Sequence, residues 1–145
     1  MAASLHSSWL YPTRRRAKSR QIEIDGNSRI SSETIKVYGE IEINKDYSND
    51  DINNIIKKLY NTKFFSEIST NFSNNTLKII VVENPIINTI ILDGEKAKKY
   101  KKVILEIISL KEKSSYVESD IKNDIELIKS FYKSLGFYAV EVEAR

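Results

Sequence analysis

Residues 47–56, Tyr-Ser-Asn-Asp-Asp-Ile-Asn-Asn-Ile-Ile, decide how the chain is organised, because their pattern occurs a second time. Residues 116–125 read Tyr-Val-Glu-Ser-Asp-Ile-Lys-Asn-Asp-Ile. The Tyr, the central Asp-Ile, the Asn and the final Ile stand at the same places, 69 positions later. Five identical residues in one order and at one spacing indicate an internal repeat.

The match extends in both directions from this stretch. Upstream, Asp25-Gly26 corresponds to Asp93-Gly94, at a spacing of 68. Downstream, Leu59-Tyr60 corresponds to Phe131-Tyr132, at a spacing of 72. The spacing grows by about one helical turn along the chain, so we expect the second copy to contain the longer helix. The sequence therefore predicts two copies of one module.

The first half of the module has the pattern of a strand followed by two helices. Residues 21–25 alternate between polar and apolar side chains, as a strand does, and end in a turn. Ser31 or Ser32 is placed to cap a first helix, and Ser48 to cap a second. The apolar side chains after Ser48 recur at helical spacing, which predicts one buried helix face.

The second half of the module has the pattern of a hairpin. Asn74-Asn75, a pair that tolerates positive φ, joins two expected strands over residues 67–72 and 76–83. The strand over residues 76–83 is apolar on both faces for four residues, which favours a central position. The strand over residues 67–72 is more polar and suits an edge. The module is thus predicted to run β-α-α-β-β.

The second copy is expected to begin at Ile86, with two helices and then a strand over residues 138–144. The first copy continues for a further turn and strand, whereas the given sequence stops at Arg145. We therefore expect an α+β fold of two tandem modules, the second truncated before its last strand. The expected divisions are a leader at 1–20, a first module at 21–85 and a second at 86–145.

The net charge of +3 is unevenly distributed along the chain. Residues 1–20 carry five basic residues and no acidic ones, while the remainder holds 18 basic and 20 acidic residues, a net charge of −2. We expect residues 1–20 to be a disordered leader, with an organellar transit peptide or a nucleic-acid-binding arm as alternatives. Its apolar residues are scattered and its charges come last, so no signal peptide is visible.

Composition argues against catalysis and metal binding. The chain has no cysteine, which excludes disulfides, thiolate nucleophiles and cysteine-ligated metals. The one histidine, His6, has no partner residue in its segment, and Asp50-Asp51 is interpreted as a helix-start pair. We expect no enzyme activity, no catalytic residue, no metal and no cofactor.

The residues that join the two copies, Val81-Val82-Glu83-Asn84-Pro85-Ile86-Ile87-Asn88-Thr89-Ile90-Ile91-Leu92-Asp93-Gly94, resemble the junction between successive POTRA domains of BamA-type outer membrane assembly factors. Ile24-Asp25-Gly26-Asn27 resembles the start of their first POTRA domain. The β-α-α-β-β order is also that of POTRA domains, and the resemblance covers residues 21–145. Lys63 stands where the family often has Gly.

The resemblance implies a periplasmic module, at the outer membrane of a Gram-negative cell, that receives unfolded outer membrane proteins. Its implied partners are those client proteins, accessory assembly lipoproteins or periplasmic chaperones, and a C-terminal β-barrel of its own full-length protein. The POTRA regions of two-partner secretion transporters and of organellar relatives are alternatives with the same fold.

The physical mechanism that we expect is β-augmentation, in which a client segment adds to an exposed sheet edge through backbone hydrogen bonds. The expected site is the strand over residues 67–72, together with a groove beside the second helix. Replacing Ser69 or Asn71 with Pro is expected to weaken client binding and leave the fold largely intact. The candidate residues are Glu67, Ile68, Ser69, Thr70, Asn71, Phe72, Ile56 and Tyr60.

A basic nucleic-acid-associated protein is the alternative of a different class. It depends on the leader and on a run of lysines around Tyr100. The lysines alternate with a regular apolar helix face, so we interpret them as a solvated surface, and no nucleic-acid partner is expected. The run comprises Lys96, Lys98, Lys99, Lys101 and Lys102.

Overall fold

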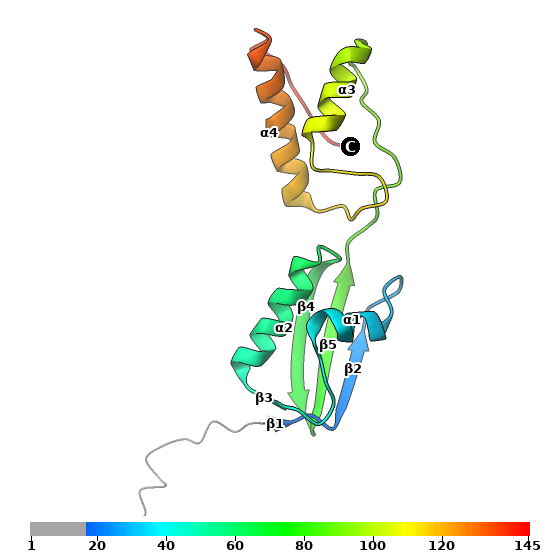
Figure 1. The fold of residues 1–145 in the computed structure, drawn as a ribbon, viewed down its shortest axis with the longest axis vertical. Helices are drawn as coiled ribbons and strands as arrows, with labels where there is room; N and C mark the ends of the chain where they lie inside the picture. Colours follow the sequence, from blue (N-terminus) through cyan, green and yellow to red (C-terminus); the bar gives the residue numbers. More distant parts are fainter. Residues whose placement is uncertain (1–16) are drawn as a thin grey trace, which may run out of the picture. The chain divides into compact units, whose positions relative to one another are not determined.

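The computed structural model describes residues 17–145, which divide into two units between Glu83 and Asn84. The division lies next to the boundary expected after residue 85. The first unit contains a three-stranded sheet with two helices, and the second contains two further helices (Figure 1).

Strand β5 (Thr76–Glu83) is the centre of the sheet, whose order is β2-β5-β4. Strand β2 (Gln21–Asp25) pairs with it in parallel, and β4 (Phe65–Ser73) in antiparallel orientation. The turn residues Asn74 and Asn75 have φ of 50° and 58°, the positive values that a two-residue hairpin turn requires. The predicted strands, the hairpin and the central place of β5 are confirmed.

Two helices cover one face of this sheet (Figure 1). Helix α1 (Ser32–Gly39) begins after Ser31, whose Oγ accepts a hydrogen bond from the N–H of Thr34 at 3.1 Å. Helix α2 (Asn49–Asn61) begins after Ser48, which exchanges two such bonds with Asp51 in a capping box. Both predicted caps are confirmed, and Ser31 is the one used at the first helix.

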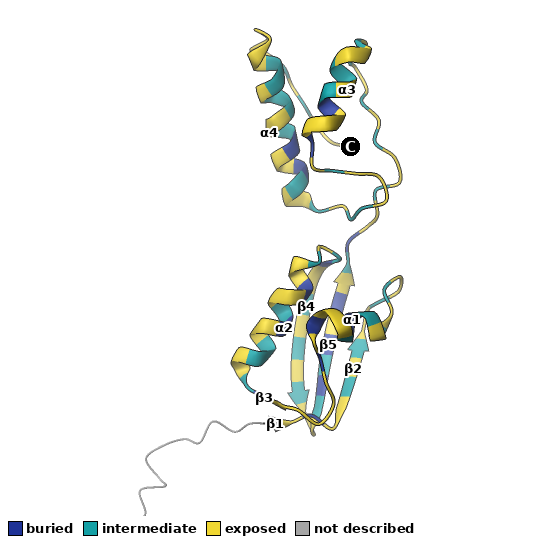
Figure 2. Ribbon diagram, in the orientation of Figure 1, coloured by how far each residue is buried: buried dark blue, intermediate teal, exposed yellow. Residues whose placement is uncertain are grey.

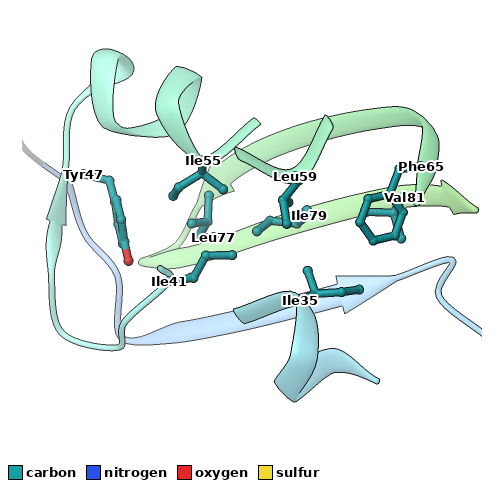
Figure 3. Packing of buried hydrophobic residues seen from close by; sticks show 9 residues of the cluster. All are labelled: Ile35, Ile41, Tyr47, Ile55, Leu59, Phe65, Leu77, Ile79 and Val81. Atoms are coloured by element: carbon teal, nitrogen blue, oxygen red, sulfur yellow. The ribbon is translucent and has the colours of Figure 1, made fainter. Parts of the chain in front are cut away.

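The core lies between these helices and β5, as Figures 2 and 3 show. Alternate residues of β5 point into it and are at most 1% exposed. Ile80 and Val82, which alternate with these residues, lie on the other face and are 42% and 47% exposed. Among the described residues, then, the apolar run of β5 is covered on one face only. The core consists of Ile35, Ile41, Tyr47, Ile55, Leu59, Phe65, Leu77, Ile79 and Val81.

The expected leader is too long by four residues. Strand β1 (Ala17–Lys18) pairs with β3 (Asp46–Tyr47), and Ser19 is completely buried. The N–H of Arg20 donates to the carbonyl of Asn75 at 2.7 Å. Pairing of two-residue strands between distant segments leaves no periodic pattern in a sequence, which explains the error. The rest of the expected leader, including His6, lies outside the described residues.

Glu83, the last residue of β5, holds the loop between β2 and α1 against the sheet. Its carboxylate accepts hydrogen bonds from the backbone N–H groups of Ser28, Arg29 and Ile30 at 2.8–3.2 Å. Burial by itself would raise the pKa of this carboxyl group, but these donors and the Arg29 guanidinium hold the pKa below its ordinary value. In the same loop Gly26 has φ 86°, and a Cβ there would lie 2.0 Å from the carbonyl oxygen of Val81.

The second unit consists of α3 (Lys98–Ile107) and α4 (Glu118–Ser134), packed around Ile104, Ile108 and Ile121. Helix α4 has 17 residues and its counterpart α2 has 13, which confirms the longer helix predicted for the second copy. The buried carboxylate of Asp124 accepts hydrogen bonds from the N–H groups of Ser109 and Leu110, both at 2.9 Å. These bonds fix the chain as it leaves α3.

The strand expected over residues 138–144 is absent, and no strand is assigned anywhere in residues 84–145. In the first unit β2 and β4 are both held by β5, and residues 84–145 contain no counterpart of that strand. Val140 and Val142 are nevertheless half-buried and Glu141 between them is exposed, so the alternation of a strand persists.

We predict that Glu83→Gln lowers the free energy of unfolding of the first unit by about 1–2 kcal/mol at pH 7, because a charged acceptor of three hydrogen bonds is lost. A carboxyl group whose pKa is lowered on folding stabilises the fold above its unfolded pKa and loses this effect as the pH falls. The difference from wild type should therefore narrow below the ordinary pKa of 4.5.

Urea titrations at several pH values, followed through amides of β5, measure this difference. Glu42→Gln is the matched control, because Glu42 is exposed and its side chain has no such role. A difference that stayed constant from neutral to strongly acidic pH would contradict the assigned role of Glu83.

Candidate strand-binding edge

The outer side of β4 presents backbone groups that the sheet does not use. In an antiparallel ladder, successive residues direct their N–H and C=O groups alternately toward and away from the partner strand. The two-residue turn makes Ser73 and Thr76 a hydrogen-bonded pair, and the register then gives Asn71 and Ser69 the same orientation. The residues whose backbone groups point away from β5 are Ile68, Thr70 and Phe72.

An open groove of about 450 Å³ lies between this edge and helix α2. Ile52 and Phe72 give it apolar surface, and the side chains of Asn49 and Asn53 give it amide donors and acceptors. The capping box at Ser48 fixes the start of α2, and Ile55 and Leu59 anchor the helix in the core. The groove is lined by Asn49, Ile52, Asn53, Thr70, Asn71 and Phe72.

The six predicted residues of the strand fall on two faces. Ile68, Thr70 and Phe72 are half-buried on the helix side. The other three, Glu67, Ser69 and Asn71, are exposed. The ladder is irregular between Phe65 and Glu67, so the regular edge begins at residue 68.

The expectation about proline at Ser69 or Asn71 is wrong. The N–H groups of both residues point toward β5, so proline at either position would remove a bond of the ladder and damage the sheet. Thr70 is the position where proline removes an outward N–H and spares the ladder. Side-chain alternation alone does not reveal this difference, because it reports faces of the sheet and not the direction of the backbone donors.

The two predicted residues of α2 lie on the same helix face as the groove but outside its lining. Ile56 is half-buried one turn beyond Ile52. The hydroxyl of Tyr60 accepts a hydrogen bond from the N–H of Ile68 at 3.0 Å. Tyr60 therefore contacts the edge itself.

Asn49, Ile52 and Asn53 were not among the predicted site residues, although a signal for them exists. With Ile56 they occupy positions i, i+3, i+4 and i+7 of one helix, which places all four on one face. Extending the predicted face toward the start of α2 would have found them.

The turn between α2 and β4 sets how the helix face meets the edge. Lys63 adopts φ 61°, the left-handed conformation that favours glycine. Its N–H donates to the carbonyl of Tyr60 at 3.0 Å, and the N–H of Phe64 donates to the Thr62 hydroxyl at 3.2 Å. The departure noted at Lys63 thus places a side chain where the backbone conformation is strained.

The chemistry of this edge is that of binding. The groove contains amide and apolar groups and the edge contains backbone donors and acceptors, with no ionisable side chain among the lining residues. Within residues 17–145 there is no group of three His, Cys, Asp or Glu side chains arranged to hold a metal ion. In the same part of the chain, no helix is long and apolar enough to cross a membrane.

Comparison with known proteins connects this geometry to a family. Residues 85–145 match the POTRA family, described as a surface antigen variable number repeat. Over 113 residues the chain is 26% identical to the outer membrane protein assembly factor BamA of Neorickettsia risticii (strain Illinois). The alignment covers 78% of this chain, which spans 15% of the length of that relative.

Two solved structures share the fold. The N-terminal domain of Omp85 from Thermosynechococcus elongatus superposes with a TM-score of 0.57 at 11% identity, covering 84% of this chain and 53% of that one. POTRA1-2 of the periplasmic domain of Omp85 from Anabaena superposes with a TM-score of 0.51 at 13% identity, covering 92% and 88%. The second of these is a tandem pair, as the repeat predicts for this chain.

We predict that Lys63→Gly raises the free energy of unfolding of the first unit by about 1 kcal/mol, because glycine adopts positive φ without steric cost. Lys57→Gly makes the same change at an exposed position inside α2 and should lower it by about 1 kcal/mol. Urea denaturation measures the free energy of unfolding of both variants. If Lys63→Gly were as destabilising as Lys57→Gly, the strain assigned to this turn would be refuted.

Proposed function

This chain carries POTRA domains of the BamA/Omp85 type of outer membrane assembly factor, and we propose that the first domain binds unfolded outer membrane proteins on the edge of β4. In this proposal, an extended client segment becomes a fourth strand of the sheet. The region of the edge that takes part contains the outward backbone groups of Thr70 and Phe72.

The observation that carries the proposal is the outward direction of the backbone groups of Thr70 and Phe72, next to the groove. Hydrogen bonds to a backbone do not depend on which side chains the partner carries. An edge of this kind suits clients whose sequences differ but which all contain strand-forming segments.

The groove supports the proposal because it offers room for alternate side chains of the docked strand. Side chains of an added strand alternate between the two faces of the sheet, and those on the helix side would enter the groove. Ile52 and Phe72 provide contact for apolar side chains, while Asn49 and Asn53 provide hydrogen bonds for polar ones. We therefore expect the groove to accept both apolar and polar side chains of the client.

The site of action that we propose is the periplasmic face of the outer membrane. The name of the relative from Neorickettsia risticii and the periplasmic origin of the Anabaena structure support this location. Accessory assembly lipoproteins or periplasmic chaperones would be further partners of the same module. The proposed function is binding alone and includes no enzymatic step.

We further propose that the second domain is completed by a strand between residues 89–93 and 138–144, equivalent to β5. Gly94 has the same φ of 86° as Gly26, yet nothing lies within 4 Å of its Cβ position. The loop therefore keeps the conformation that accommodates the carbonyl of a central strand, and the half-buried alternation of Val140 and Val142 supports the same conclusion.

For the first domain we predict that Thr70→Pro weakens client binding about fivefold, the effect of losing one hydrogen bond of about 1 kcal/mol. The probe is a labelled synthetic peptide with the sequence of a strand from an outer membrane protein, and fluorescence anisotropy measures its Kd. Thr70→Val, which keeps the N–H, is the matched control and should bind more tightly than Thr70→Pro. Equal affinity of Thr70→Pro and Thr70→Val would exclude this edge as the binding site.

For the second domain the test is a chain extended after Arg145 by Asn-Asn and a copy of residues 76–83. We predict fast amide hydrogen exchange over residues 138–144 in the unextended chain, because these amides have no ladder. In the extended chain they should exchange at least tenfold more slowly, as expected of amides in a paired strand. An extension in which the apolar residues of the copy are replaced by serine is the control. Slow exchange in the unextended chain would contradict the proposal.

A further inference from the structure

The hydroxyl of Tyr60 occupies one of the backbone donors that the proposed client would need. Tyr60 is on the last turn of α2 and is 42% exposed. Its hydroxyl oxygen lies 3.0 Å from the nitrogen of Ile68, whose N–H is the first of the outward-pointing groups of the regular edge. A strand docked on β4 would meet this side chain before it reached Ile68.

The open part of the edge is therefore short and has two defined ends. At one end stand the Tyr60 hydroxyl and, just before it, the irregularity between Phe65 and Glu67. At the other end is the turn at Asn74-Asn75. Between them, both backbone groups of Thr70 and Phe72 are available, and the groove lies beside this same segment.

The bond from Tyr60 to the edge has no counterpart in the second domain, where residues 138–144 form no strand. The repeat aligns Tyr60 with Tyr132 and Ile68 with Val140, both at a spacing of 72. The hydroxyl of Tyr132 bonds to the carboxylate of Glu95 instead. The tyrosine hydroxyl thus bonds to the strand in the domain where the strand is formed, and to a carboxylate in the domain where it is not.

We propose that Tyr60 is a specificity-determining residue that limits the docked strand to the segment Thr70–Phe72 and so sets its register. This inference rests on the proposed function and adds the point on β4 at which backbone pairing with the client ends. A client in the extended conformation gains hydrogen bonds at Thr70 and Phe72, and the carbonyl that would pair with the N–H of Ile68 finds that donor already occupied. Ligands with a short paired segment are therefore preferred over those with a long one.

The experiment compares Tyr60→Phe with wild type, using the same strand peptide and its Kd. Removal of the hydroxyl frees the Ile68 N–H and keeps the ring, so we expect binding to become about three- to fivefold tighter through one added hydrogen bond. Tyr38→Phe is the matched control, because Tyr38 is similarly exposed and its ring contacts Phe64. It should leave the Kd unchanged.

Amide hydrogen exchange with and without peptide supplies the register. In wild type the peptide should slow exchange at Thr70 and Phe72 only, whereas in Tyr60→Phe it should also slow exchange at Ile68. A merely structural role for the hydroxyl would change exchange of the free protein and leave the peptide-induced pattern as in wild type.

The outcomes separate the two proposals. Peptide-induced protection of Thr70 and Phe72, with no gain at Ile68 in Tyr60→Phe, would overturn the role of Tyr60 and leave the proposed function standing. Protection of Ile68 in wild type would also overturn it. If the peptide protected neither Thr70 nor Phe72, the proposed function would fail and this inference would fall with it.

Discussion

The pairing of β5 with strands on both sides is the interaction on which the first domain depends. β2 and β4 are not paired with each other, so β5 alone joins them in one sheet. Its buried side chains form the floor on which α1 and α2 pack. Its last residue, Glu83, then holds the loop that leads into α1, and the carbonyl of Val81 lies so close to Gly26 that only glycine fits. The hydrogen bonds of the sheet, the packing of the core and the conformation of the loop before α1 therefore all depend on the eight residues of β5.

The second domain shows what such a module keeps in the absence of that strand. Its helices form and pack although neither begins with a side-chain cap, because their apolar faces bury each other. The loop at Gly94 keeps its conformation, because that conformation is local too. The segments that correspond to β2 and β4 do not become strands, because a strand requires a neighbour. The two copies therefore separate the parts of the fold that arise locally from those that need the centre of the sheet.

The same distinction explains how much could be predicted from the sequence. The caps at Ser31 and Ser48, the turn at Asn74-Asn75 and the central place of β5 were predictable, because each leaves a short local pattern. The pairing of β1 with β3 was missed, since it joins two-residue strands from distant segments. The candidate edge was identified correctly as an outer strand, but which of its N–H groups point outward follows from the register, which had not been assigned.

The alternation along β4 has a consequence for how this surface tolerates change during evolution. Outward backbone groups at Ile68, Thr70 and Phe72 are a property of position, so substitutions there preserve them as long as proline is avoided. Insertion of a single residue within this segment would reverse the alternation and turn the outward groups inward. The length difference between the two copies falls in the helix, upstream of the strand, where it leaves that alternation untouched. The edge therefore tolerates substitutions, whereas it does not tolerate an insertion or deletion of a single residue.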